Sequence, residues 1–281
     1  MKMFNFKQIA TASLLTLGLM TVGTGVSFAQ SQDLTIDGDH GKLAAVLQTP
    51  DKAKEYPLVI VCHGFTSNKD TNLMQTLAND LEKKGIATLR FDFNGHGKSE
   101  GRFQDMTVLN EIEDAKKVYD YATKLPHVTS ISLAGHSQGG VVASMTAGIL
   151  GTEKVKSLAL MAPAAVLRED AIRGDCQGAR YNANNVPETI PIKKGLTLGR
   201  NYVLTAQTLP IYETAIRYQG PAFMIHGTGD VIVPYTYSQR YQRIYFNGQL
   251  KLVPGEDHGF THDTKGACQA VANYFAAQLK K

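Results

Sequence analysis

Two kinds of apolar spacing alternate along the chain. Short apolar runs are typical of strands in a buried parallel sheet, and they lie at 43–48, 58–62, 86–91, 131–134, 155–161, 222–226 and 250–253. Apolar residues spaced three or four apart predict helices at 71–84, 108–125, 139–150 and 263–279. Strands that alternate with helices predict an α/β fold with a mostly parallel central sheet and helices on both faces.

One segment departs from this alternation. Residues 164–218 are rich in Asn, Gly, Pro and Tyr and show no clean helical or strand period. The segment lies between two predicted strands, and its roughly 55 residues are enough to hold structure of their own. Because insertions at the carboxyl edge of such a sheet usually cover the ligand site, we predict an inserted cap over the site.

The first 29 residues have a pattern of their own. Two lysines flank a basic start, a mostly apolar stretch follows, and small residues stand one and three positions before a cleavage point after Ala29. The apolar stretch is short and interrupted for a membrane span. We therefore predict a signal peptide at 1–29 and one domain at 30–281. The protein is expected to be secreted or periplasmic, without stable membrane association after cleavage.

Composition and charge limit the classes of binding partner that we expect. The chain has 281 residues, of which 43% are apolar and 19% charged, an ordinary globular composition. A net charge of +4 without a basic run gives no reason to expect nucleic acid. Cys62, Cys176 and Cys268 have no metal-binding spacing, and we expect three separate thiols, with a Cys176–Cys268 disulfide as the alternative that export leaves open. No cofactor or metal is expected, and a homodimer is left open.

The segment 135–139 has the pattern G-x-S-x-G. It follows one predicted strand and precedes an apolar helix, which is the context of a nucleophile elbow. The turn is sharp, and side chains on either side of the serine would collide, so glycine is required at both positions. The pattern predicts Ser137 as a nucleophile.

A serine nucleophile needs a base and a carboxylate that orients the base. His258 comes just after the predicted strand at 250–253, and we predict it as the base. Asp230 comes directly after the strand at 222–226 and is the preferred carboxylate. Asp257 is the alternative, but residues adjacent in sequence usually point in different directions. The chain order Ser, Asp, His is that of the α/β-hydrolases.

Acyl transfer also needs donors for the developing oxyanion. We predict the backbone N–H groups of Gln138, next to the nucleophile, and of Phe65, in the loop after the strand at 58–62. Two other interpretations fail. The Gly97-Lys98-Ser99 segment lacks the glycine that a phosphate-binding loop needs five residues earlier, and the His258 region lacks the glutamate of a zinc H-E-x-x-H site.

Together these residues resemble the α/β-hydrolase superfamily and, more narrowly, the bacterial cinnamoyl or feruloyl esterases. The motifs are His63-Gly64-Phe65-Thr66, Arg90-Phe91-Asp92-Phe93-Asn94-Gly95-His96-Gly97, Gly135-His136-Ser137-Gln138-Gly139-Gly140, Gly227-Thr228-Gly229-Asp230 and Asp257-His258. The resemblance extends into the insertion. It implies an α/β-hydrolase fold with a cap in which Asp170, Gln177 and Tyr202 bind the ring hydroxyls of ferulic or caffeic acid.

The expected function is that of an exported serine esterase with a small-molecule ester as substrate. Other hydrolases of this fold remain alternatives, namely a general short-chain carboxylesterase, a peptidase, a thioesterase or a lipase. A lipase cap should be more apolar than the segment 170–177, and a peptidase usually carries a larger extra domain. A non-catalytic binding protein is disfavoured because all three catalytic residue types are present.

Overall fold

The computed structural model describes residues 30–50 and 53–279. The predicted signal peptide at 1–29 lies outside the described residues.

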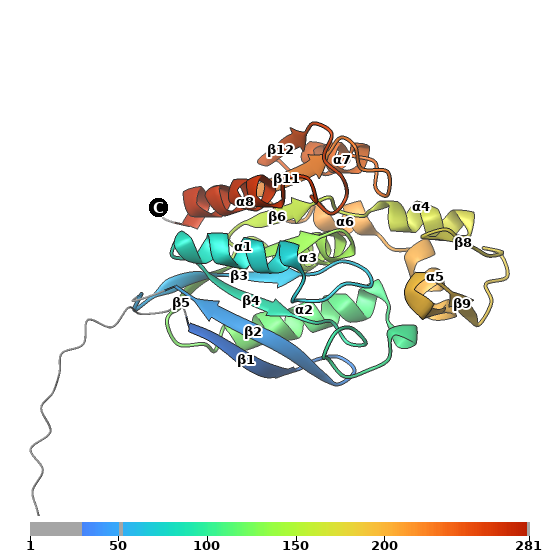
Figure 1. Ribbon diagram of the computed structural model, residues 1–281, viewed down its shortest axis with the longest axis horizontal. Helices are drawn as coiled ribbons and strands as arrows, with labels where there is room; N and C mark the ends of the chain where they lie inside the picture. Colours follow the sequence, from blue (N-terminus) through green and yellow to red (C-terminus); the bar gives the residue numbers. More distant parts are fainter. Residues whose placement is uncertain (1–29, 51–52, 280–281) are drawn as a thin grey trace, which may run out of the picture.

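The core of the fold is an eight-stranded sheet (Figure 1). In spatial order its strands are β1 (Gln30–Asp37), β2 (Lys42–Thr49), β4 (Ala87–Phe91), β3 (Tyr56–Cys62), β5 (Val128–His136), β6 (Leu158–Met161), β11 (Ala222–Gly227) and β12 (Gly248–Val253). The β1–β2 and β2–β4 pairs are antiparallel, and all other pairs are parallel. The predicted mostly parallel sheet is confirmed.

Helices cover both faces of the sheet because alternate strand residues point to opposite sides. On β3, Leu58 and Ile60 pack on the face covered by α2 (Val108–Ala122), α3 (Gln138–Leu150) and α7 (Thr236–Ile244). Val59 and Val61 pack on the other face, which α1 (Asn72–Lys83) and α8 (Thr264–Leu279) cover (Figure 1). This strand is therefore buried from both sides, as its continuous apolar run predicts.

Among the strands of the eight-stranded sheet and the helices named above that cover it, two elements were not predicted from the apolar pattern. The strand β1 lies at the edge of the sheet and is largely exposed, so it carries no apolar run. The helix α7 is mostly polar and buries few residues, Ser238 and Tyr241 among them. Both elements are held by packing against their neighbours, which a single-sequence pattern does not report.

The segment 164–218 forms a separate group of small elements between β6 and β11. They are α4 (Val166–Arg173), β7 (Asp175–Cys176), β8 (Ala179–Arg180), β9 (Thr189–Pro191), η2 (Lys193–Gly195), β10 (Thr197–Gly199), α5 (Arg200–Gln207) and α6 (Ile211–Ala215). Figure 1 places α4, α5, β8 and β9 beyond one end of the sheet, at the right of the view. We call the segment 164–218 the cap.

The three cysteines, Cys62, Cys176 and Cys268, are buried free thiols. In residues 30–50 and 53–279, no helix combines the length and the apolar character needed to cross a bilayer.

Candidate active site

Ser137 stands at a sharp turn between β5 and α3. Its backbone has φ 56° and ψ −124°, a conformation that residues other than glycine seldom adopt. The Ser137 N–H donates to the carbonyl oxygen of Met161, the last residue of the neighbouring strand β6, at 2.9 Å. The turn therefore holds the serine at the carboxyl edge of the sheet.

The glycines on either side of this turn are required on steric grounds. A Cβ atom on Gly135 would lie 2.1 Å from the Gly139 carbonyl oxygen, and one on Gly139 would lie 2.3 Å from that of Cys62. Both obstacles are backbone atoms, which cannot rotate away as a side chain can. The turn therefore excludes any larger residue at either position.

Three side chains from the ends of three strands form a hydrogen-bonded series. Ser137 Oγ lies 2.9 Å from His258 Nε2, and His258 Nδ1 lies 2.7 Å from Asp230 Oδ2. Asp230 follows β11 and His258 follows β12, and these strands are parallel neighbours whose ends meet at one edge. The structure thus brings together the residues predicted as nucleophile, base and orienting carboxylate.

The Asp230 carboxylate accepts four hydrogen bonds. The backbone N–H groups of Ile232 and Val233 donate to Oδ1, both at 2.8 Å, and Oδ2 accepts from His258 and from His226 Nε2, the latter at 3.0 Å. Burial acts to raise the pKa of Asp230, but the bonds from His226 and His258 hold that pKa below its usual range. Asp230 is therefore ionised at neutral pH and can stabilise a protonated His258.

The alternative carboxylate, Asp257, is engaged elsewhere. It accepts hydrogen bonds from the Thr261 backbone N–H, at 2.9 Å, and from the Thr261 hydroxyl. These bonds shape the turn after His258.

His136 joins the serine turn to the histidine loop. Its Nε2–H donates to the His258 carbonyl oxygen at 2.8 Å, and the two rings lie 5.0 Å apart. Burial and, after it, the neighbouring His258 lower the pKa of His136 to about 3. A neutral His136 therefore helps to fix the backbone that carries His258.

The two residues predicted to donate to an oxyanion, Phe65 and Gln138, line the same cavity as Ser137. Gln138 is the first residue of α3, so its N–H belongs to the first helical turn, where N–H groups have no partner inside the helix. Phe65 lies in the loop after β3.

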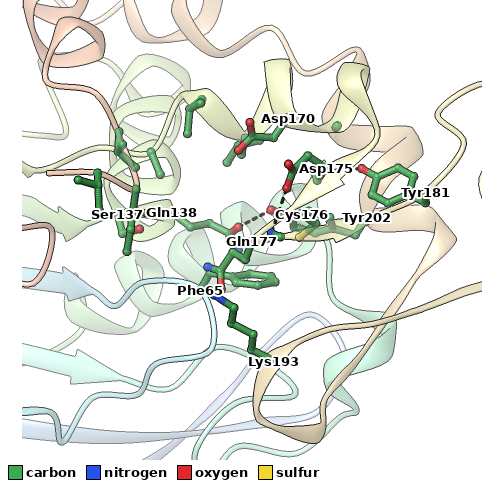
Figure 2. A pocket seen from close by; sticks show the side chains of 18 residues that line it. Phe65, Ser137, Gln138, Asp170, Asp175, Cys176, Gln177, Tyr181, Lys193 and Tyr202 are labelled. Atoms are coloured by element: carbon green, nitrogen blue, oxygen red, sulfur yellow. Dashed lines mark hydrogen bonds between the residues drawn. The ribbon is translucent and has the colours of Figure 1, made fainter.

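A cavity of about 370 Å³ extends from Ser137 beneath the cap (Figure 2). The three residues predicted from the resemblance, Asp170, Gln177 and Tyr202, all line it. The Tyr202 hydroxyl donates to Gln138 Oε1 at 2.7 Å. Burial raises the pKa of Asp170 although the carboxylate also accepts from the neighbouring Arg173.

The cavity includes further residues that the sequence did not indicate as part of the site. They are Ala164, Val166, Leu167, Ala171, Asp175, Cys176, Gly178, Tyr181 and Lys193 from the cap, with Val231, Ile232 and Val233 after Asp230. Position alone could have indicated the last three, because they directly follow Asp230 at the carboxyl edge. The cap residues carry no such signal, because the cap has no regular period.

Among the described residues, Glu256, Asp257 and His262 offer ligand atoms within 4.8 Å of one another and so could hold a metal ion. However, buried Glu256 accepts from the backbone N–H groups of Asp257, His262 and Asp263. Its oxygens already shape the loop that carries His258.

A serine on a strand-turn-helix elbow, with aspartate and histidine supplied by two neighbouring strand ends, defines an α/β-hydrolase. A family model described as serine aminopeptidase, S33, matches residues 53–200, more than half of the chain. The chain belongs to this family of α/β-hydrolases.

The likeness to solved structures also places the chain with the bacterial cinnamoyl or feruloyl esterase family. Est1E from Butyrivibrio proteoclasticus, solved with ferulic acid bound, is 35% identical, with a TM-score of 0.85 over 88% of this chain and 100% of Est1E. A second Est1E structure gives 32% identity and a TM-score of 0.81, covering 89% of this chain and 99% of Est1E.

An uncharacterized 31.7 kDa protein of Escherichia coli is 32% identical over 100 residues, which are 35% of this chain. This match spans only about a third of the curated relative, 35% of its length.

Proposed function

We propose that the protein is an exported serine esterase that hydrolyses hydroxycinnamate esters, such as those of ferulate, caffeate and coumarate. The observation that carries the proposal is the Ser137–His258–Asp230 series, whose serine lines a capped cavity. The likeness to Est1E, which binds ferulic acid, supports the substrate class.

The geometry indicates the order of the reaction steps. Ser137 Oγ attacks the ester carbonyl while His258 Nε2, 2.9 Å away, takes its proton. Asp230 stabilises the imidazolium, and the N–H groups of Phe65 and Gln138 hold the oxyanion. His258 then protonates the departing alcohol and activates the water that hydrolyses the acyl-enzyme.

The cap supplies substrate selection in this proposal. Asp170, Gln177 and Tyr202 provide polar atoms in a cavity that also has aromatic and aliphatic walls. A site built to hydrogen-bond a hydroxyl strongly rejects an analogue that lacks it. The aromatic acid of the ester therefore occupies the part of the cavity beneath the cap.

A peptidase is the second candidate, because the matching family model is described as a serine aminopeptidase. An aminopeptidase has to pair the free ammonium group of its substrate with an acid. The two carboxylates of the cavity, Asp170 and Asp175, form ion pairs with Arg173 and Arg180. This pairing favours the esterase.

A substrate panel tests the proposal. We expect kcat/KM for methyl ferulate and methyl caffeate to exceed that for short aliphatic methyl esters by at least about tenfold, and alanine p-nitroanilide to be a poor substrate. Equal rates on aromatic and aliphatic esters would reduce the protein to a general carboxylesterase. Faster cleavage of the anilide would favour the peptidase.

Export is tested separately by fractionation and N-terminal sequencing. We expect the mature chain to begin at Gln30 and to be found outside the cytoplasm. An uncleaved chain in the cytoplasmic fraction would contradict this part of the proposal.

A further inference from the structure

A buried carboxyl group lies behind the proposed oxyanion site and has no part in the mechanism above. Glu111, on α2, is 2% exposed, and its Oε2 accepts from Gln138 Nε2 at 2.8 Å. That partner is a neutral amide and not a cation. Burial, the main cause, raises the pKa of Glu111 to about 8. Because burying such a group costs free energy, its place beside Gln138 needs an explanation.

Glu111 fixes the orientation of the Gln138 amide. The nitrogen Nε2 lies 2.8 Å from Glu111 Oε2 and 3.8 Å from Met106 Sδ. A thioether sulfur cannot donate, and the carboxyl oxygen Oε2 can accept whether or not the other oxygen carries a proton. The amide nitrogen therefore faces these two acceptors, and the amide oxygen faces the cap.

Tyr202 completes the series from the side of the cap. Its hydroxyl donates to Gln138 Oε1 at 2.7 Å, and Figure 2 shows this bond in the wall of the cavity. A phenol hydroxyl has one hydrogen to donate, and here that hydrogen bond goes to Gln138. Tyr202 can therefore offer a ligand only its oxygen lone pair. An acceptor suits a hydroxyl donor and does not suit an ether or methoxy oxygen, which can only accept.

We propose that Glu111 is a positioning residue that sets the hydrogen-bond polarity of the cavity through Gln138 and Tyr202, so that the site selects acyl groups whose ring carries a hydroxyl. This inference rests on the proposed esterase function and assigns its specificity to a residue outside the cavity wall. Glu111 acts only through Gln138, the residue whose backbone N–H is a proposed oxyanion donor.

A purely structural role predicts a different outcome. If Glu111 only anchored α2 to α3, its loss would slow the hydrolysis of every ester by a similar factor. If it sets polarity, its loss changes the ratio between a hydroxylated ester and its unhydroxylated counterpart.

The experiment replaces Glu111 and compares kcat/KM for methyl caffeate with that for methyl cinnamate, which lacks the ring hydroxyls. In Glu111→Met the Gln138 amide can rotate and offer its nitrogen to Tyr202, whose proton then turns toward the ligand. We expect the preference for caffeate to fall about tenfold, the size of one hydrogen bond. Thermal unfolding checks that the variant is folded, because Met has a similar size to Glu and removes the cost of burying a carboxyl group.

Two matched variants sharpen the result. Glu111→Gln keeps a carbonyl oxygen as acceptor and should restore most of the preference. Asp114→Asn changes another buried carboxyl of α2 that accepts from the backbone N–H groups of Asp39 and Asn94. Because Asp114 bonds to backbone N–H groups, the preference should not change in Asp114→Asn.

A double-mutant cycle with Tyr202→Phe completes the test. If the effect passes through Tyr202, Glu111→Met causes no further loss of preference in the Tyr202→Phe background. Equal fold-changes in both backgrounds, or equal slowing on both esters, would overturn the inference. A wild-type enzyme that hydrolyses neither ester contradicts the proposed function, and the inference with it.

Discussion

The floor of the cavity and its cap are held in place by different means. We call Ser137, Asp230 and His258 the floor residues. Each follows a parallel strand of the central sheet, and hydrogen bonds join their side chains directly. The cap consists of short helices and two-stranded pairs inserted between β6 and β11. The catalytic side chains thus stand at the ends of sheet strands, whereas the proposed selection of substrate depends on an inserted segment with short elements of its own.

The largest expected effect is a loss of catalysis at the floor residues that leaves ligand binding by the cap intact. Ser137→Ala removes the nucleophile, and we expect kcat on methyl ferulate to fall about 10⁶-fold. Binding of ferulate by the cap should persist, with Kd within about threefold of wild type, because Ser137 contributes little of the wall. Steady-state kinetics and calorimetry measure the two quantities. Retained turnover would remove Ser137 from the reaction.

A glycine-to-alanine substitution beside the floor residues and another in the cap compare how well each part accommodates an added methyl group. In the floor, a Cβ atom on Gly139 would meet backbone oxygens of Cys62 and His63, both at 2.3 Å. In the cap, Gly178 has open space around its Cβ position, although its φ is +87°. We expect Gly139→Ala to cost about 3 kcal/mol or more, and Gly178→Ala about 1 kcal/mol from backbone strain. Urea unfolding measures both, and equal losses would contradict the comparison.

Two histidines near the floor residues are buried and neutral. Because of them, we expect the free energy of unfolding to decrease in acid. Burial lowers the pKa of His63 and of His136 to about 3 in each case. In the unfolded chain a histidine takes up a proton near pH 6.5. Between about pH 6.5 and 3 the unfolded state therefore binds more protons than the native state, and stability falls as the pH falls.

Replacing one of these histidines should flatten that dependence. His63 Nε2 accepts from the Phe93 N–H at 3.1 Å, so protonation of His63 would break a buried contact. In His63→Asn we expect the slope of unfolding free energy against pH to decrease by up to about 1.4 kcal/mol per pH unit. Urea unfolding at pH 7, 6 and 5 measures the slope. His127→Asn, in an exposed turn, serves as the control, and an unchanged slope in His63→Asn would refute the explanation.

The placement of Ser137, Asp230 and His258 at one edge of the sheet follows from local features of the sequence. The G-x-S-x-G turn is contiguous, and Asp230 and His258 stand just after apolar runs that identify their strands. A parallel sheet then brings these strand ends to one edge, whatever the intervening sequence.

The remaining parts of the site depend on three-dimensional contacts that no local sequence pattern indicates. Glu111 lies within a helix whose charged residues resemble an ordinary solvated face, yet it reaches Gln138, 27 positions along the chain. His226 bonds Asp230 only because the loop after β11 folds back. In the cap, resemblance and not periodicity indicated Asp170, Gln177 and Tyr202, since its elements are only two to eight residues long.

The smallest expected effect tests whether the cap binds the ring. Asp170 is partly exposed, so one lost hydrogen bond should raise KM for methyl caffeate about fivefold in Asp170→Ala, while kcat changes less. Arg173→Ala is the matched control, because it removes the ion-pair partner but leaves the carboxylate. A partly exposed pair is worth little, so KM there should stay within about twofold of wild type. If Asp170→Ala leaves KM for methyl caffeate unchanged, ring selection depends on Gln177 and Tyr202, and the polarity set by Glu111 becomes its main determinant.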